Sequence, residues 1–544
     1  MLQGSLDDGR GAIVQSLAKE FEINNLKIRD IVDHFVKQIK RGLQSKHSYQ
    51  IPSFITQIPS GQEKGLFLAI DLGGTNCRVC AVDLHGDSTF DTFQKKHVVP
   101  SEIRVHASHE PLFRFIATKL YEFLQEYVPE KGAGSNKSEH TFNLGFTFSF
   151  TCEQTSISQG TLVHWDKGWD IPTALGRDPC ALLQDAIDEL HLPVKVCVLA
   201  NDAVGTLLAR AYTSNKKDSA LASIILGTGT NAAYVEHMSN IQRLDMTQSD
   251  TASYAKDGVM VINTEWGCWD DELVVLPHTR YDKQVDQTSS DPGCGLFEKM
   301  VSGMYLGELL RLALLELIQH GALDMTFQQD SPVHQPMGIE SAFLTKVAEF
   351  RQNDSSALSY LASSLAAKGM SANDLHTVQT LATAIVRRSA RLVGAGLAAI
   401  LVQSNRLQVT STDQKTGSIQ DVHEIGQKPP KLQTKGFLLS FTRFIRNLCG
   451  CISPKKELPM TYDTPCDSKD TLEKLAAEDD VINIAVDGSL FEFHTEFENM
   501  MRSALRDIPE IGILNEARLK IELTRDGSGT GAALIAAVAE SNTK

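Results

Sequence analysis

The 544-residue sequence has no long apolar run, and no segment reaches the roughly 18 consecutive apolar residues typical of a membrane-spanning helix. Its N-terminus, from Met1 to Arg10, carries two aspartates and no apolar core, so we expect no signal peptide there. Basic residues are outnumbered, because 52 lysines and arginines against 67 aspartates and glutamates give a net charge of −15. An acidic chain is a poor candidate for binding nucleic acid through bulk charge.

The sequence is also poor in cysteine, with ten residues that show no regular spacing. Sparse cysteines argue against a disulfide scaffold and predict reduced, mostly buried side chains in a cytoplasmic protein. Cys449 and Cys451 are one residue apart and have no second pair nearby, which argues against a zinc site. The chain as a whole has 42% hydrophobic and 22% charged residues, which suffices for a large core and two or more domains.

Helix-like apolar stripes alternate with short apolar strands along most of the chain. The residues between 65 and 84 predict a β-hairpin whose turn contains glycines and an aspartate. The other expected elements are helices over 11–46, 110–127, 203–212, 296–320, 371–403 and 527–542, and strands over 144–150, 194–199, 222–226 and 232–236. Alternating strands and helices predict an α/β fold.

Residues 404–480 interrupt this alternation, because they are rich in Ser, Thr, Lys, Gln and Pro and lack clear periodicity. We interpret them as a mostly disordered insertion. Within it, residues 435–451 place apolar side chains at helix-like spacings beside two arginines and end in Cys449 and Cys451. This segment is typical of a membrane-surface contact strengthened by acylation. A partner-binding or self-docking helix, or translated non-coding sequence, stays open as an alternative.

Three separate glycine-rich turns occur at 71–76, 227–231 and 526–531. Glycine lets backbone N–H groups surround phosphate oxygens, so these turns are candidate phosphate sites. None matches the P-loop pattern. Two of the turns carry an aspartate, Asp71 and Asp526, and an acidic residue beside a phosphate cradle suggests a divalent cation between them.

Polar residues end several apolar segments. Asn201 and Asp202 directly follow an expected strand, where Asp202 could be a general base or simply the N-cap of the next helix. Glu265 and Glu298 add two carboxylates, and arrays of this kind suit sugars, whose hydroxyls both donate and accept. Lys167 lies between two tryptophans and fits this scheme, or is an exposed loop cation.

Nine motifs occur in the order found in the eukaryotic hexokinases, and the chain resembles most the fungal single-unit form. The motifs are Asp71-Leu-Gly-Gly-Thr-Asn-Cys-Arg, Leu144-Gly-Phe-Thr-Phe-Ser-Phe, Trp165-Asp-Lys-Gly-Trp-Asp-Ile, Asn201-Asp-Ala-Val-Gly-Thr, Gly227-Thr-Gly-Thr-Asn, Asn263-Thr-Glu-Trp-Gly, Tyr305-Leu-Gly-Glu-Leu, Val486-Asp-Gly-Ser and Asp526-Gly-Ser-Gly-Thr-Gly-Ala-Ala. The resemblance covers about residues 15–403 and 481–542.

This resemblance implies a two-lobed ribonuclease-H/actin-like (sugar kinase) fold with the insertion near its C-terminus. The implied large lobe comprises N-terminal helices in 1–63, residues 200–403 and an adenosine side in 481–525. The small lobe comprises 64–199, and 526–544 would add a phosphate turn and a helix that packs on it. We expect a monomer or a dimer, in the cytoplasm that the sparse cysteines predict.

The implied reaction is transfer of the ATP γ-phosphoryl group to the 6-hydroxyl of a hexose such as glucose. Asp202 would be the general base, with Lys167 as a second catalytic residue. The matching sugar positions are Ser149, Lys167, Asn201, Asp202, Asn231, Glu265 and Glu298. The matching nucleotide positions are Asp71, Gly73, Gly74, Thr75, Asn76, Arg78, Gly227, Thr228, Gly229, Ser341, Thr345, Gly488 and Ser489. ATP and Mg²⁺ are implied as well, although no residue is assigned as a metal ligand.

Some residues depart from the family pattern and motivate a second hypothesis. Asp166 replaces the threonine usual before the sugar-binding lysine, and Cys294-Gly295 replaces two glutamines. Cys77, Thr151 and Ala203 are further substitutions. The alternative is a catalytically weak or inactive hexokinase-like regulator that acts in carbon-source signalling through partners.

Overall fold

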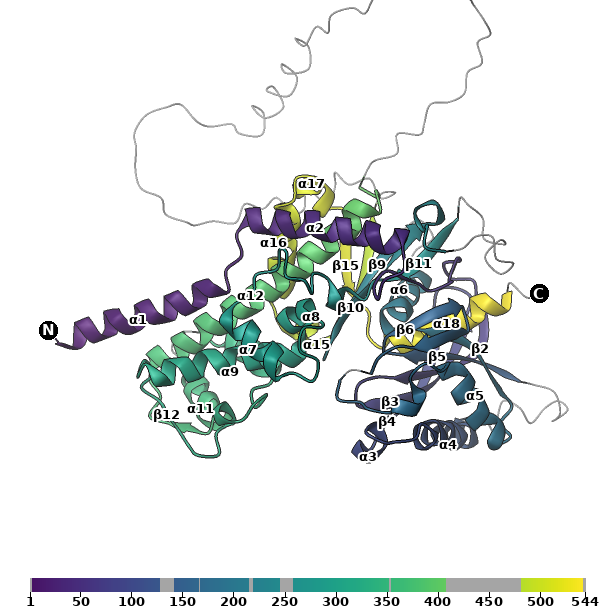
Figure 1. Cartoon of the computed structure of the whole chain (residues 1–544), viewed down its shortest axis with the longest axis horizontal. Helices are drawn as coiled ribbons and strands as arrows, with labels where there is room; N and C mark the ends of the chain where they lie inside the picture. Colours follow the sequence, from purple (N-terminus) through teal and green to yellow (C-terminus); the bar gives the residue numbers. More distant parts are fainter. Residues whose placement is uncertain are drawn as a thin grey trace, which may run out of the picture. The chain divides into compact units, whose positions relative to one another are not determined.

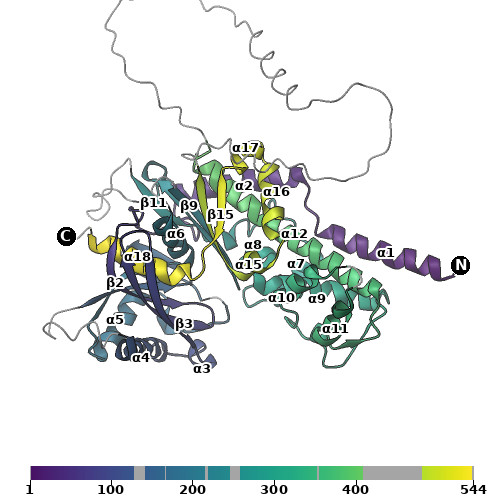
Figure 2. The same cartoon turned by 180° about the vertical axis from the view of Figure 1, so that it is seen from behind.

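The computed structural model describes residues 2–127, 141–165, 167–214, 219–244, 258–351, 354–407 and 481–541. Figures 1 and 2 show these elements from opposite sides. Asp166 lies outside the described residues. So do 408–480, which contain nearly all of the predicted insertion and the whole of its segment 435–451.

A five-stranded sheet forms one half of the architecture, in the order β4-β3-β2-β5-β8. Its strands are β2 (Lys64–Leu72), β3 (Asn76–His85), β4 (Phe90–Val98), β5 (Phe142–Phe148) and β8 (Val194–Ala200). The pairs β2–β3 and β3–β4 are antiparallel, whereas β2–β5 and β5–β8 are parallel. The predicted hairpin is confirmed, and its turn spans residues 73–75.

Helices cover both faces of this sheet. Apolar side chains of α4 (Glu110–Tyr127) and α5 (Pro179–Glu189) form a core with one face. Side chains of α6 (Asp202–Thr213) and α18 (Gly527–Ser541) form a core with the other face. Helix α18, drawn in yellow, therefore packs on β2 and β5 although it comes from the far C-terminus (Figure 2).

A six-stranded sheet forms the second half, in the order β1-β11-β10-β9-β14-β15. Its strands are β1 (Ile51–Pro52), β9 (Ser219–Leu226), β10 (Thr230–His237), β11 (Val259–Asn263), β14 (Ile482–Asp487) and β15 (Leu519–Leu523). Here too a glycine-rich turn, residues 227–229, joins an antiparallel hairpin whose first strand pairs in parallel with a neighbour. The two sheets thus share one local plan.

A long helix, α12 (Ala372–Gln403), organises the helical layer beside the second sheet and contacts α2 and α16. It starts with a capping box in which the Ser371 hydroxyl and the Asp374 carboxylate exchange hydrogen bonds with backbone N–H groups. The remaining helices are α1 (Leu2–Glu20), α2 (Asn25–Gln44), α3 (Ser101–Arg104), α7 (Arg280–Thr288), α8 (Leu296–Val301), α9 (Gly303–Gln319), α10 (Ser341–Glu349), α11 (Ser355–Ser364), α15 (Ser489–Phe493), α16 (Phe497–Arg506) and α17 (Gly512–Glu516). The remaining strands are β6 (Cys152–Ser156), β7 (Gln159–Leu162), β12 (Thr326–Phe327) and β13 (Ala367–Lys368), and 3₁₀ turns occur at Pro172–Ala174, Met238–Asn240, Trp266–Cys268 and Pro332–His334.

Two predicted helices are each divided in the structure. The helix expected over 11–46 is α1 followed by α2, because the Asn24 side chain accepts a hydrogen bond from the Lys27 N–H and starts a new helix. The helix expected over 296–320 is α8 followed by α9. Its break at Ser302 lets the N–H groups of Gly303 and Met304 donate to the carbonyl oxygens of residues 227 and 228, at 2.9 and 3.1 Å.

We propose that the two sheets mark the two lobes, 64–199 for the small lobe and 200–403 with 481–525 for the large lobe. The N-terminal helices in 1–63 would belong to the large lobe, and 526–544 would complete the small one. Both α6 and α18 contribute to the apolar core that also takes in β10 and β11 of the second sheet, so the two halves share buried side chains.

The contact between α6 and α18 gives a stability prediction. A Cβ added at Gly531 would lie 1.9 Å from the Gly205 carbonyl oxygen, so Gly531→Ala forces the two helices apart. We expect urea unfolding to show a loss of about 1–3 kcal/mol, the usual cost of overpacking. Gly11→Ala is the control, because Gly11 lies in α1 with no atom within 4 Å of an added Cβ, and should be neutral or slightly stabilising. Equal stabilities of Gly531→Ala and the unmodified chain would contradict this prediction.

Candidate active site

A pocket of about 520 Å³ collects residues from both sheets and from their connecting segments. All seven predicted sugar positions line it: Ser149, Lys167, Asn201, Asp202, Asn231, Glu265 and Glu298. Eight predicted nucleotide positions line it too: Asp71, Gly73, Gly74, Arg78, Gly227, Thr228, Gly229 and Gly488. Residues far apart in the sequence therefore meet in one cavity that contains glycine turns and several carboxylates.

A second pocket, of about 670 Å³, adjoins the first, since Gly227 and Thr228 line both. Ser341, Thr345 and Ser489, predicted on the adenosine side, line this second pocket. Thr75 and Asn76 line neither pocket and instead shape the β2–β3 turn. The Thr75 carbonyl accepts from the Val99 N–H at 3.0 Å, and the Asn76 amide donates to the Thr75 hydroxyl at 2.8 Å.

Side-chain amides link four polar residues at the floor of the pocket. The Nδ2 group of Asn231 donates to Oδ1 of Asn201 at 3.0 Å and to Oδ1 of Asn263 at 2.8 Å. Asn263 in turn donates to Oε1 of Glu265 at 2.8 Å. Because a satisfied network of this kind holds its members in one orientation, the three lining residues are fixed relative to each other. Sequence reasoning did not assign Asn263, although it begins the Asn263-Thr-Glu-Trp-Gly motif.

Asp202 is the first residue of α6, and the N-cap is Asn201, whose side chain accepts from the Ala203 N–H at 2.9 Å. Asp202 also contacts this N–H through Oδ1 at 2.8 Å. The capping role considered for Asp202 is therefore mainly played by its neighbour, and Asp202 lines the pocket as well. A carboxylate there suits proton abstraction from a bound hydroxyl.

Lys167 lies in a tight loop, and the tryptophans two residues before and after it in the sequence stack on each other with ring centroids 5.4 Å apart. Its backbone has a φ of +55°, an uncommon conformation for a side chain with a Cβ. The ammonium group donates to the Ser149 carbonyl oxygen at 2.6 Å and lies 5.3 Å from the Phe150 ring centroid. These contacts hold the cation at the pocket wall, which favours a role in the pocket over the exposed loop cation considered from the sequence.

The two glutamates of the pocket are positioned in different ways. Glu265 has a φ of +47°, so its left-handed backbone turns the chain directly after β11. Glu298, in the first turn of α8, accepts from the Thr230 N–H at 2.8 Å through Oε2. The same oxygen would lie 2.5 Å from a Cβ added at Gly229, so a larger residue there would displace the Glu298 carboxylate.

Four carboxylates lie near one arginine at the phosphate end of the pocket. Burial raises the pKa of Asp71, and burial together with the charges of Asp202 and Asp526 raises the pKa of Asp487 to about 6. Arg78 contacts Asp526 at 2.7 Å and Asp71 at 4.0 Å, and it opposes both shifts. This excess of negative charge would be relieved by a cation. The Val486-Asp-Gly-Ser motif predicted nucleotide contacts at Gly488 and Ser489, but no role for Asp487.

This charge cluster suits a Mg²⁺ ion that is held jointly by the protein and by the phosphates of a nucleotide. Among the described residues, no group of three or more His, Cys, Asp or Glu side chains has the spacing of a metal site. Mg²⁺ typically uses one or two carboxylates together with substrate phosphates and waters, so a closed protein cage is not required.

The departures from the family pattern are accommodated in different ways. Cys77 is fully buried, and this burial strongly raises the pKa of its thiol, so it packs as an apolar side chain. Ala203 is buried inside α6. Gly295 has a φ of +65°, a conformation that a glutamine would adopt only with strain. Thr151 lines the pocket, whereas Asp166 cannot be placed because it lies outside the described residues.

Two family models, both described as hexokinase, match most of the chain. One matches residues 13–212, and the other matches 221–435 and 460–538. The chain belongs to the hexokinase family. Residues 436–459 lie between the two matched parts of the second model, within the predicted insertion.

Relatives and solved structures agree with this hexokinase assignment. The chain is 37% identical to a glucokinase of Aspergillus niger over 96% of both chains. It is 39% identical to hexokinase-1 of Saccharomyces cerevisiae over 62% of this chain and 67% of that one. The structure resembles that of a Schistosoma mansoni hexokinase complexed with glucose, with a TM-score of 0.74, 29% identity, and coverage of 98% and 99%.

These findings confirm the predicted fold class and reaction class of this hexokinase. The fold is the two-lobed, actin-like sugar kinase fold, and the chain is an ATP-dependent hexose kinase. No helix among the described residues has the length and apolar character needed to cross a bilayer.

The carboxylate cluster gives a pH-dependent prediction. The pKa of Asp487 is about 6 in the folded chain against an ordinary 3.8, so ionising it destabilises the fold as pH rises through this range. Asparagine cannot ionise, so Asp487→Asn should be more stable than the unmodified chain at pH 7.5. The gain should be about 1–3 kcal/mol and should vanish towards pH 4, measured by urea unfolding. The exposed Asp330→Asn serves as control, and a gain that is equal at both pH values would contradict the prediction.

Proposed function

We propose that this hexokinase transfers the γ-phosphoryl group of ATP to the 6-hydroxyl of glucose, with Asp202 as the general base. The observation that carries this proposal is the single pocket in which Asp202 and six further polar residues face two glycine-rich turns. Glucose is favoured as the hexose because the relatives include a glucokinase and a hexokinase complexed with glucose.

In this mechanism the sugar binds among donors and acceptors that are already ordered. Both amide hydrogens of Asn231 are donated to Asn201 and Asn263, so Asn231 holds these neighbours of the sugar in one orientation. Glu265 and Glu298 each present a carboxylate that can accept from vicinal hydroxyls, which bind more strongly to a charged acceptor than to a neutral one. Prepositioned groups of this kind reduce the entropic cost of orienting the sugar.

The 6-hydroxyl oxygen would then attack the γ-phosphorus while Asp202 takes its proton. Lys167, held by the Ser149 carbonyl, would supply a positive charge near the attacking oxygen and the transferred phosphoryl group. The N–H groups of Gly74, Thr228 and Gly229 would donate to phosphate oxygens. Those of Gly73 and Gly227 instead close their own turns, by donating to the carbonyl oxygens of Asn76 and Gly229 at 3.0 Å. The adenosine would occupy the adjoining pocket beside Ser341, Thr345 and Ser489.

Mg²⁺ that accompanies ATP would be held near Asp71, Asp487 and Asp526, where negative charge is in excess. When bound, it would neutralise charge on the phosphate oxygens. The regulatory alternative is not favoured by any observation in the described residues, because every charged sugar position faces the pocket.

The general base is tested by Asp202→Ala. We expect kcat for glucose phosphorylation, measured in a coupled assay with MgATP, to fall by about 10²–10⁴-fold, since no other group would take the proton. Glucose should still raise the melting temperature of this variant, because ligand that binds only the folded chain stabilises it. Near-normal turnover in Asp202→Ala would contradict the assignment. No turnover by the unmodified chain would support the regulator instead.

We also propose that the protein resides in the cytoplasm and contacts a membrane surface or a protein through 435–451. Support comes from the sequence pattern and from the family model, which leaves 436–459 unmatched. Deleting residues 430–456 should shift the tagged protein from the membrane fraction to the soluble fraction, and Cys449→Ser with Cys451→Ser should do so in part. If all variants are equally soluble, the membrane contact is wrong; if the deletion raises kinase activity, the segment is an internal brake.

A further inference from the structure

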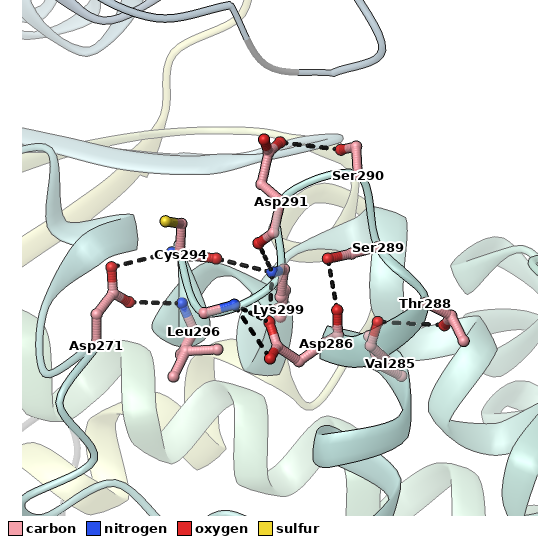
Figure 3. A network of polar contacts seen from close by, with 12 residues as sticks. Asp271, Val285, Asp286, Thr288, Ser289, Ser290, Asp291, Cys294, Leu296 and Lys299 are labelled. Carbon is pink, nitrogen blue, oxygen red and sulfur yellow. Dashed lines mark hydrogen bonds and ion pairs between the residues drawn. The ribbon is translucent and has the colours of Figure 1, made fainter.

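The first turn of α8 is held by a carboxylate that comes from outside this helix. Asp271 accepts from the Gly295 N–H through Oδ2 at 3.1 Å and from the Leu296 N–H through Oδ1 at 2.8 Å (Figure 3). Gly295 is the N-cap position of α8 and has no capping side chain, so Asp271 takes over the role of the missing cap. The helix start is therefore fixed by a residue 24 positions earlier in the chain.

A buried lysine organises the loop that leads into α8. The ammonium group of Lys299, a residue only 5% exposed, donates to Oδ1 of Asp286 and to the carbonyl oxygens of Asp291 and Cys294, at 2.7, 2.7 and 2.8 Å. All three donors of the lysine are thereby used (Figure 3). Asp286, in the last turn of α7, also accepts from the Gly293 N–H at 2.9 Å, so its ion pair with Lys299 ties the loop 289–295 to both helices.

Glu298 lies between these two attachments. It is two residues after Leu296 and directly precedes Lys299, and its carboxylate reaches the sugar pocket, where it accepts from the Thr230 N–H. The backbone just before Glu298 is thus held by Asp271, and the residue just after it, Lys299, is tied to the preceding loop. Neither Asp271 nor Lys299 is among the residues that line the pocket.

We propose that Asp271 and Lys299 are positioning residues that act on the sugar through Glu298, by fixing the loop 289–295 and the first turn of α8. The inference rests on the proposed binding of the sugar by Glu298. Without the two attachments, the Glu298 carboxylate would have to be ordered when the sugar binds, and the entropic cost of this ordering would weaken sugar binding.

The same loop also touches the segment that carries Lys167. The Nε2 atom of His164 lies 3.5 Å from Oδ1 of Asp291, and His164 is three residues from Lys167 in the chain. The loop therefore connects the glutamate side of the pocket with its lysine side. This largely exposed pair contributes little energy by itself, so the loop is held mainly by the contacts of Asp271 and Lys299.

The charges around Asp271 predict a pH dependence that supports the geometry. Burial raises the pKa of Asp271 to about 6; the N–H bonds and Lys299 oppose this shift, and Asp286 adds to it. The thiol of Cys268 is also near Asp271, and the charges of Asp271, Glu265 and Glu298 add to the burial that raises the pKa of this thiol. Below about pH 6 the carboxyl would gain a proton and hold the two N–H groups less well.

Steady-state kinetics of the full chain test this inference. Asp271→Asn and Lys299→Met should each raise the KM for glucose by about tenfold or more while changing the KM for ATP less than about twofold. The controls are Glu272→Gln, an exposed carboxylate beside Asp271, and Lys283→Met, an exposed lysine on α7, and both should behave as the unmodified chain. The KM of the unmodified chain should rise as pH falls through about 6, and Asp271→Asn should lose this rise.

A double-mutant cycle separates positioning from a general structural effect. In the Glu298→Gln background, Asp271→Asn should change the glucose KM by less than about twofold, because the group that it positions is altered. Multiplicative effects, or an unchanged KM in Asp271→Asn alone, would overturn the inference while leaving the proposed function intact. If Lys299→Met does not fold, the Asp271 cycle decides by itself. Failure of the unmodified chain to phosphorylate glucose would instead overturn the proposed function, and this inference with it.

Discussion

The close packing of α6 against α18 is the constraint on which the site depends most. Gly205 and Gly531 let the two backbones approach so closely that an added Cβ at either would meet backbone atoms, at 2.7 and 1.9 Å. Helix α6 carries Asn201 and Asp202 at its start, and α18 follows the turn that carries Asp526. A shift of either helix would therefore move the candidate base relative to the phosphate turns, since both are anchored to the same interhelical contact.

Buried polar groups then determine how the sugar residues face one another. The amides of Asn201, Asn231 and Asn263 form a continuous series with Glu265, and every link is between 2.8 and 3.0 Å. An unsatisfied amide in this position would cost about 1–3 kcal/mol, so the network strongly disfavours other orientations. The Asp271 and Lys299 contacts have the same function for Glu298, because they fix the helix on which it is carried.

Electrostatics divides the pocket into two parts. At the sugar end, Lys167 offsets the two glutamates. Backbone contacts hold Lys167 and Glu298 in place, and the Asn263 amide holds Glu265. At the phosphate end, Arg78 is near Asp71, Asp487 and Asp526, so negative charge exceeds positive charge there. That imbalance is costly in a partly buried site, and a nucleotide that brings its own divalent cation relieves it.

The sequence by itself determined the order of motifs, the family, the glycine turns and the catalytic candidate, because these depend on residue type within short segments. It also determined most elements, such as the β2–β3 hairpin and α12, since their periodicity and caps are local. Only the tertiary structure decided the break between α8 and α9, which depends on hydrogen bonds from Gly303 and Met304 to a turn more than seventy residues away. It also decided the roles of Asn263, Asp487 and Asp271. Apolar periodicity reports which face of an element is buried, but not which distant backbone or carboxylate its polar groups will meet.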